Sequence, residues 1–168
     1  MTRLSFRALS ALGFLGCVFG MAFALYLQHA KGFEPCAMCI FQRVAMCGSA
    51  LFFLIGALHG PKAGGGRWIY ALLAGLAALI GAGIAGRQVW LQSLPADQVP
   101  SCGPTLGYLM KLMPLQNVIT YVLKGEGNCA KIDAQWLGIA LPEWTLFAFI
   151  GLTLFALATP LLARRGTR

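Results

Sequence analysis

Residues 68–86 read WIYALLAGLAALIGAGIAG and contain no charged side chain. A helix needs about 20 predominantly apolar residues to cross the hydrocarbon core of a bilayer. Backbone N–H and C=O groups in lipid must find their partners within the segment, so such a stretch is helical rather than a lone strand. Its length and composition therefore predict a transmembrane helix.

Three further stretches have the same character, at residues 8–27, 40–58 and 144–162, and none of the four contains an acidic residue. The alternation of polar and apolar residues that marks a membrane barrel is missing from the sequence. The pattern predicts an all-α membrane protein, a bundle of four transmembrane helices that forms one domain over residues 1–168.

The composition excludes most other classes. The chain is 58% hydrophobic and 11% charged, whereas a soluble domain carries about 25% charged residues. A net charge of +8 is compatible with nucleic-acid binding, but the basic residues are scattered between apolar runs and form no stripe. We therefore expect a lipid bilayer, and no nucleic acid, as the surroundings of this chain.

The charged residues divide between the two sides of a four-span layout. The basic residues on one side are Arg3, Arg7, Lys62, Arg67, Arg164, Arg165 and Arg168. All five acidic residues fall on the other side: Glu34, Asp97, Glu126, Asp133 and Glu143. Because an excess of Lys and Arg marks the cytoplasmic side, both termini are predicted to be cytoplasmic, with external loops at 28–39 and 87–143.

A cleaved signal peptide is the alternative for the first span. Arg3 and Arg7 would form its basic region, and residues 22–24, AFA, match a cleavage site. The apolar run is longer than the usual 7–15 residues and continues past that site, which favours a retained helix.

The six cysteines are unevenly distributed. Cys17 and Cys47 lie within the first and second spans and are interpreted as small buried apolar residues. The other four fall in the external loops: Cys36, Cys39, Cys102 and Cys129. Disulfides form and persist outside a bacterial inner membrane, so this sorting indicates thiol chemistry on the outer side.

The sequence CAMC at residues 36–39 is a C-x-x-C motif directly before the second span. Pro35 suits the first turn of a helix, and the N-terminus of that helix would favour a thiolate at Cys39. Arg43 follows one turn deeper on the same face and is a candidate site residue; anchoring at the interface is its alternative role. For Arg87, at the outer end of the third span, anchoring is the favoured interpretation.

The long second loop contains apolar residues at helical spacing, namely Leu115, Val118, Ile119 and Val122. This spacing predicts a short amphipathic helix on the outer membrane surface. A loop held there could carry Cys102 and Cys129 toward the C-x-x-C motif.

Two non-enzymatic interpretations remain open. A structural zinc site could use the four outer cysteines, but their spacing departs from the usual close pairs and His29 is the only outer histidine. A scaffold with structural disulfides is the other, although a C-x-x-C bridge closes too small a loop to stabilise a fold appreciably. The sequence also lacks a nucleotide-binding glycine motif such as G-x-G-x-x-G after a strand, which disfavours a soluble hydride carrier as the cofactor.

Several motifs together resemble the DsbB family of bacterial disulfide-forming membrane proteins. They are QH at 28–29, PCAMCIFQR at 35–43, the region 86–92, NCA at 128–130, WLG at 136–138 and PEW at 142–144. The resemblance covers essentially the whole chain. Gln42 departs from it, since some members have Glu there, and so does Ser93, near a position where some members carry His.

The resemblance implies a quinone-linked thiol oxidase of the bacterial inner membrane. Its implied partner is a periplasmic DsbA-type protein of the thioredoxin fold, and its implied acceptor is ubiquinone, or menaquinone without oxygen. By position, Cys36 and Cys39 would be the quinone-coupled pair, Cys102 and Cys129 the pair that exchanges with the partner, and Arg43 a quinone-site residue. A vitamin K epoxide reductase type of enzyme is the alternative, but that family would place the quinone-facing C-x-x-C late in the chain.

Overall fold

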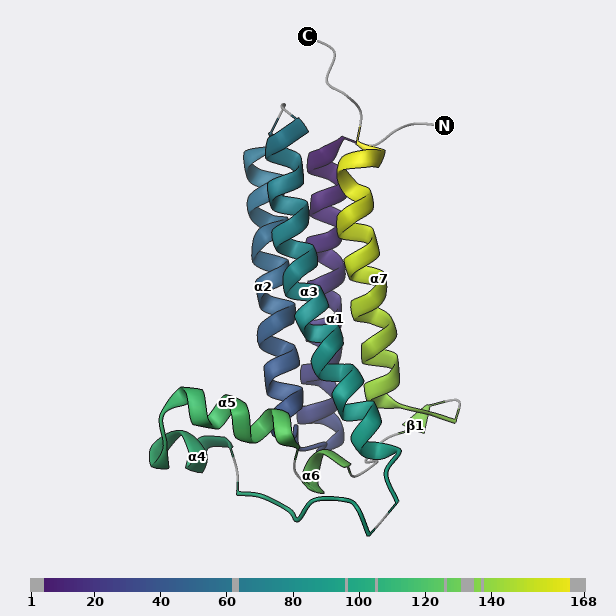
Figure 1. Cartoon of the computed structure of the whole chain (residues 1–168). Coiled ribbons are helices and arrows are strands. Elements are labelled where there is room, and N and C mark those ends of the chain that lie inside the picture. The colour runs from purple at the N-terminus through teal and green to yellow at the C-terminus, as the bar shows by residue number, and fades with distance from the viewer. Residues whose placement is uncertain are drawn as a thin grey trace.

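Four long helices form a bundle, and the short elements gather at one end of it (Figure 1). The computed structural model describes residues 5–61, 64–95, 97–104, 106–125, 127–130, 135–136 and 138–163. The helices are α1 (Phe6–Lys31), α2 (Ala37–His59), α3 (Gly64–Gln92), α4 (Leu106–Leu112), α5 (Leu115–Lys124), α6 (Gly127–Ala130) and α7 (Leu141–Leu162). Two short strands, β1 (Gln135–Trp136) and β2 (Ile139–Ala140), pair antiparallel just before α7.

The long helices α1, α2, α3 and α7 confirm the four predicted spans, since each is long and apolar enough to cross a membrane. Each helix is longer than the apolar stretch that predicted it. The largest extension is in α3, which continues to Gln92. Helical hydrogen bonding continues past Gly86, where the predicted span ends, so Arg87 and Gln88 belong to a helix and not to the predicted second loop.

Helix α3 shows why these four helices require a bilayer. Its small side chains are buried between helices: Ala71, Ala74, Ala78, Ala82 and Ala85. Its large side chains point outward, and Leu72, Leu76 and Leu79 are 53%, 55% and 57% exposed. Small residues at helix interfaces let backbones approach closely; at Gly81, an added Cβ would overlap the Phe149 ring of α7. The apolar outer surface is suited to lipid.

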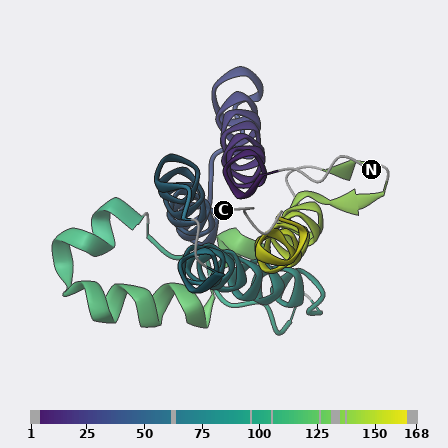
Figure 2. The same cartoon turned by 90° about the horizontal axis from the view of Figure 1, so that it is seen from above.

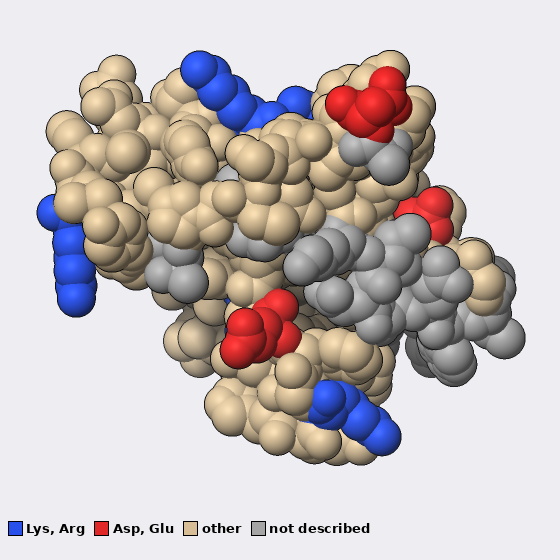
Figure 3. All heavy atoms as spheres, turned by 90° about the horizontal axis from the view of Figure 1, so that it is seen from below, with Lys and Arg blue, Asp and Glu red and all other residues tan. Residues whose placement is uncertain are grey.

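Among the described residues, acidic side chains lie at one end of the bundle only. At one end Arg7 donates to the carbonyl oxygen of Ala57 at 2.9 Å, and Phe6, Leu9 and Ala163 pack together. At the other end lie Glu34 and Asp97, in segments between helices, and Glu143, in the first turn of α7. Arg67, which was also used to predict the orientation, donates from Nε to the carbonyl oxygen of Pro61 at 3.0 Å. The other residues used for that prediction lie outside the described residues: Arg3, Lys62, Glu126, Asp133, Arg164, Arg165 and Arg168. In Figure 3 the acidic and basic side chains of the loop-bearing end are separated by uncharged surface.

The second loop projects sideways from the bundle as α4 and α5 (Figure 2). Helix α5 was predicted and α4 was not. The predicted apolar stripe of α5 is divided in the structure: Leu115 and Ile119 are exposed, but Val118 and Val122 are buried against α2 and α3. Half of the stripe expected to face the membrane therefore contributes to the protein core.

The two cysteines within the spans also differ from each other. Cys17 is buried beside Phe53 in the core of the bundle, as predicted. Cys47 is exposed on the outer surface of α2, so its interpretation as a buried residue is wrong.

Candidate functional site

The C-x-x-C motif forms the N-terminus of α2. Cys36 is the N-cap residue in an extended conformation, and its sulfur accepts a hydrogen bond from the backbone N–H of Cys39 at 3.4 Å. The sulfur atoms of Cys36 and Cys39 are 2.9 Å apart, longer than a disulfide bond of about 2.05 Å. The two sulfur atoms are therefore in direct contact. Pro35 precedes the N-cap residue, so it lies outside the first helical turn in which it was expected.

A third thiol, from the second loop, reaches the same place. Cys129 of α6 is 1% exposed and packs with Cys36, Ala37 and Met38. Its hydrogen bond with Cys36, the bond between Cys36 and Cys39, and burial all raise the pKa of Cys36 above its ordinary value. The fold therefore joins one cysteine of each external loop in a single cluster of sulfur atoms.

Cys102 is exposed, and a glycine keeps its segment beside α6. The backbone N–H of Gly127 donates to the carbonyl oxygen of Ser101 at 3.1 Å. A Cβ atom at Gly127 would lie 2.5 Å from the carbonyl oxygen of Pro100 and 3.1 Å from the nitrogen of Cys102. Only glycine permits this approach without displacement. The exposed Cys102 and the buried Cys129 are thereby carried by adjoining segments.

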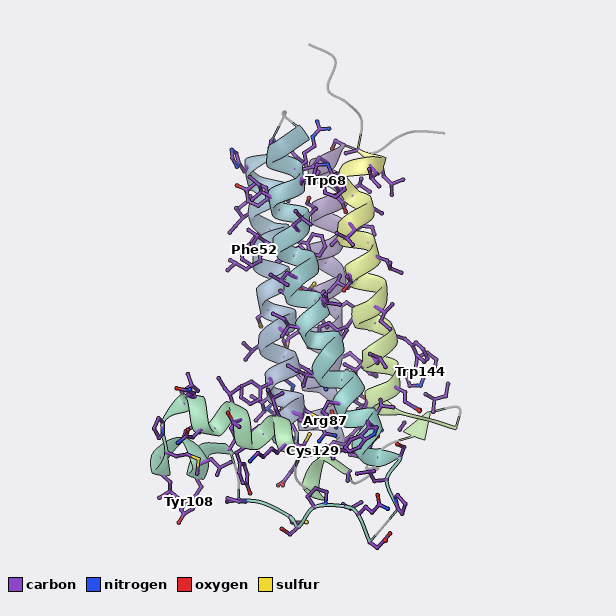
Figure 4. All side chains as sticks on the ribbon, viewed as in Figure 1. Phe52, Trp68, Arg87, Tyr108, Cys129 and Trp144 are labelled. Atoms are coloured by element: carbon purple, nitrogen blue, oxygen red, sulfur yellow. The ribbon has the colours of Figure 1, made fainter. Side chains whose placement is uncertain are left out.

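Arg87 fastens α5 to the bundle. It donates from Nε to the carbonyl oxygen of Leu123 at 3.3 Å and from Nη2 to that of Lys124 at 2.9 Å. Its guanidinium also lies 4.1 Å from the centre of the Trp90 ring. A cation at a helix C-terminus satisfies carbonyl groups that lack helical partners. These contacts give Arg87 a role within the protein, and its anchoring at the membrane interface stays a prediction. Figure 4 shows Arg87 at the same end of the bundle as Cys129.

Arg43 joins α2 to α1. Its Nη1 donates to the side-chain oxygen of Gln28, and its Nη2 donates to the carbonyl oxygen of Ala24 at 3.3 Å. The guanidinium is partly buried, as expected for a group one turn below the thiols.

A cavity of about 260 Å³ lies beside the thiols, between α1 and α7 and against α2. Cys36, Cys39 and Arg43 line it together. The rest of the wall is largely apolar and includes Met21, Phe23, Met46, Trp144 and Phe149. A mostly apolar cavity with a few polar groups at one place is typical of a small-molecule site.

Sequence reasoning missed Gln88, which is 3% exposed. Its Nε2 lies 3.5 Å from the sulfur of Cys36 and 3.6 Å from that of Cys39. Gln42, treated only as a departure from the family pattern, donates to it at 2.9 Å. Gln88 follows Ala85 by three residues, so continuing the buried face of α3 could have found it. Ser93, near a position where some family members carry His, is exposed, and its hydroxyl donates to the Trp90 carbonyl oxygen at 2.8 Å.

The described residues contain no group of three or more His, Cys, Asp or Glu side chains that could hold a metal ion, so they offer no candidate metal site.

The fold and the site together define a four-helix membrane protein whose two thiol-bearing loops meet beside an apolar cavity. The sequence matches the family described as "Disulfide bond formation protein DsbB" over residues 6–159. This chain belongs to the DsbB family.

Individual relatives agree with this assignment. The disulfide bond formation protein B of Xanthomonas oryzae pv. oryzae is 48% identical over 165 residues, covering 98% of this chain and 96% of the relative. The protein of the same name from Acinetobacter baumannii is 51% identical over 155 residues, covering 92% of this chain and 91% of the relative. That from Chromohalobacter salexigens is 48% identical over 157 residues, covering 94% and 91%. The similarity extends over whole chains, as expected for a disulfide-forming oxidoreductase of the same architecture.

Proposed function

We propose that this protein reoxidises a periplasmic DsbA-type dithiol oxidase and passes the electrons to ubiquinone, so that disulfide bonds are generated de novo. The observation that carries the proposal is the contact of Cys129 with Cys36, whose sulfur touches that of Cys39, beside a cavity that Cys36, Cys39 and Arg43 line. Thiols from both loops are in reach of one another, and one pair adjoins a space suited to an apolar ring.

The thiol steps follow from exposure. Cys102 is the exposed member of the second pair, so a thiolate of the reduced partner attacks it in the Cys102–Cys129 disulfide. The second partner thiol then resolves the mixed disulfide. The partner leaves oxidised, and Cys102 and Cys129 remain as two thiols.

The buried thiol continues the transfer. Cys129 attacks the sulfur of Cys36 in the Cys36–Cys39 disulfide, forms a Cys36–Cys129 bond between the loops and releases Cys39 as the thiolate. Cys102 then attacks Cys129, which restores the Cys102–Cys129 disulfide and frees Cys36. Each exchange requires a thiolate in line with a disulfide sulfur, and the packing of Cys36 against Cys129 favours that alignment.

The cavity residues fit a quinone head group. Their apolar side chains would surround a ring, and Arg43, which remains charged under any ordinary condition, would donate hydrogen bonds to a carbonyl oxygen at its edge. Bound there, ubiquinone, or menaquinone without oxygen, would accept the two electrons and two protons that Cys36 and Cys39 lose when they form a disulfide. Arg43 would also stabilise negative charge that develops on an oxygen beside it.

The energetics require such an acceptor. DsbA itself is strongly oxidising, with an established potential of about −120 mV, and 30 mV corresponds to about 1.4 kcal/mol in a two-electron couple. The glutathione pool, at about −200 mV or below, cannot drive its reoxidation. An acceptor of higher potential than the partner makes the cycle run downhill.

We also propose that the chain is one domain of the bacterial inner membrane, with both termini cytoplasmic and the four site cysteines periplasmic. The charge division of the sequence supports this orientation. Reporter fusions after Lys62 and after Arg165 should be active as cytoplasmic reporters, and fusions after Glu34 and after Glu126 as external ones. An external reporter at Lys62 would reverse the orientation.

The decisive experiment combines the purified protein with a reduced DsbA-type partner and ubiquinone. Quinone absorbance should fall in step with the loss of partner thiols, one quinone for each disulfide formed. The same protein carrying Cys129→Ser serves as the control and should not turn over. Partner oxidation that proceeds at the same rate without quinone would contradict the proposal.

A further inference from the structure

Gln42 and Gln88 form a buried pair of amides directly behind the two thiols of α2. Both side chains are more than nine-tenths buried, at 6% and 3% exposure. They come from adjacent helices and bond to each other, with Nε2 of Gln42 donating to Oε1 of Gln88 at 2.9 Å. A buried polar group without a partner is costly, so this bond fixes the arrangement of both amides.

The bond has a chemical consequence because an amide is not symmetrical. Its oxygen accepts hydrogen bonds and its nitrogen donates them. Because the oxygen of Gln88 accepts from Gln42 at 2.9 Å, its nitrogen is the amide atom nearer to the sulfurs, 3.5 Å from Cys36 and 3.6 Å from Cys39. The oxygen lies 3.8 Å from the sulfur of Cys39, whose thiol donates to it in the reduced pair. The opposite orientation would place the oxygen against the sulfurs and the two NH₂ groups against each other.

We propose that Gln88 is a catalytic residue that donates a hydrogen bond to the Cys36–Cys39 sulfurs, and that Gln42 is a positioning residue that sets the orientation of its amide. This assignment rests on the proposed function in one respect, that the Cys36–Cys39 pair cycles between dithiol and disulfide.

A donor at this place acts on the redox equilibrium of the pair. A thiolate is a much better hydrogen-bond acceptor than a disulfide sulfur, because hydrogen bonds to a charged group are the strong ones. The Gln88 N–H therefore favours the reduced pair, which forms whenever Cys129 delivers electrons. It also stabilises the thiolate that must leave when the bond between Cys36 and Cys39 is opened.

The test measures the reduction equilibrium of Cys36–Cys39 against glutathione, using full-length, quinone-free protein in detergent. Alkylation followed by mass spectrometry gives the reduced fraction of these two cysteines, with Cys102→Ser and Cys129→Ser present in every protein. Gln88→Met keeps the length of the side chain and removes its donor. It should lower the equilibrium constant for reduction about tenfold, or about 30 mV.

Gln88→Glu is the second variant. A carboxylate still accepts the Gln42 bond but offers the sulfurs no N–H, so it should lower the constant by at least as much. Gln42→Met should lower it less, because the Gln88 amide then loses only its orientation. In a Gln88→Met background, Gln42→Met should add nothing, since Gln42 acts only through Gln88.

Ser49→Ala is the matched control. Ser49 is also fully buried between α2 and α3, and donates to the carbonyl oxygen of Ala74 at 3.1 Å. Removing it deletes an interhelical hydrogen bond away from the sulfurs, so it should lower thermal stability and leave the equilibrium unchanged.

Two results would overturn the inference. If Gln88→Met and Gln88→Glu show the same reduction equilibrium as Ser49→Ala, Gln42 and Gln88 have a structural role only. If the effects of Gln42→Met and Gln88→Met are additive, Gln42 does not orient the amide of Gln88. The measurement contains no quinone and no partner. Failure of the proposed function would appear as a lack of quinone turnover in the unmodified protein and would leave these equilibria unaffected.

Discussion

The two cysteine-bearing loops hold their thiols in opposite ways. In the first loop, Cys36 and Cys39 belong to a long helix and their positions are set by a helix N-cap and a buried amide. In the second loop, Cys102 lies exposed in a segment between helices, and Cys129 sits in the short helix α6. The first pair is fixed beside the cavity, whereas the second has one thiol outside and one inside.

The difference fits the proposed function. A soluble partner would reach the exposed Cys102, and an acceptor in the cavity would lie beside Cys36 and Cys39. The contact of Cys129 with Cys36 links the two environments. Separating accessibility from positioning in this way lets each thiol meet one requirement, which a single C-x-x-C pair would have to meet alone.

The largest expected effect is loss of turnover when either pair is broken. Replacing any one of Cys36, Cys39, Cys102 or Cys129 with Ser should abolish steady quinone reduction by a reduced DsbA-type partner, because each thiol enters a bond in the cycle. Cys17→Ala and Cys47→Ala are the controls and should retain most of the activity. A folded but inactive Cys17→Ala protein would assign that residue a function beyond packing.

Arg43→Ala should impair the reaction with quinone beside the first loop and leave thiol exchange in the second loop nearly unchanged. We expect kcat/KM for ubiquinone to fall by about ten- to a hundredfold, and each tenfold loss equals about 1.4 kcal/mol of transition-state stabilisation. Single-turnover exchange between the partner and Cys102–Cys129 should change little, since Arg43 hydrogen-bonds to α1 and lines the cavity beside the other cysteine pair. A lower yield of folded protein with unchanged quinone kinetics would make Arg43 a helix anchor only.

The order of alkylation tests the contrast in exposure. In the fully reduced protein at neutral pH, iodoacetamide should modify Cys102 on the order of tenfold faster than Cys36. The raised pKa of Cys36 keeps it as the unreactive thiol, and its rate should increase as the pH rises toward that pKa. Peptide mass spectrometry over a pH series gives both rates. Equal rates at neutral pH would contradict the burial of Cys36 against Cys129.

The smallest effect is expected when the close contact between α6 and the Cys102 segment is disturbed. Gly127→Ala would push a Cβ against the Pro100 carbonyl group, and should slow the transfer of electrons from Cys102–Cys129 to Cys36–Cys39 by a fewfold. Gly107→Ala is the matched control, because its Cβ would enter open space in α4. Rapid-quench measurement of the Cys36–Cys129 bond follows this step. Equal rates in the two variants would exclude Gly127 from loop positioning.

Much of the fold follows from local features of the sequence. The four spans were predictable because a bilayer demands long apolar helices, and α5 because its apolar spacing is helical. The errors have a common cause. Val118 and Val122 were assigned to the membrane, and Cys47 to the interior, since a sequence pattern identifies an apolar residue without naming its neighbour. In the structure Val118 and Val122 pack against the bundle, and Cys47 is exposed on α2.

The candidate site divides in the same way. The sequence by itself determined that four cysteines lie in the loops between apolar spans, that one pair begins a helix, and that Arg43 lies one turn below it. Only the tertiary structure decided that Cys129 rather than Cys102 contacts Cys36, and that Gln88 faces the sulfurs. Helical spacing is a local property of the chain, whereas contact between α2, α3 and α6 depends on how separate helices pack, which no local pattern specifies.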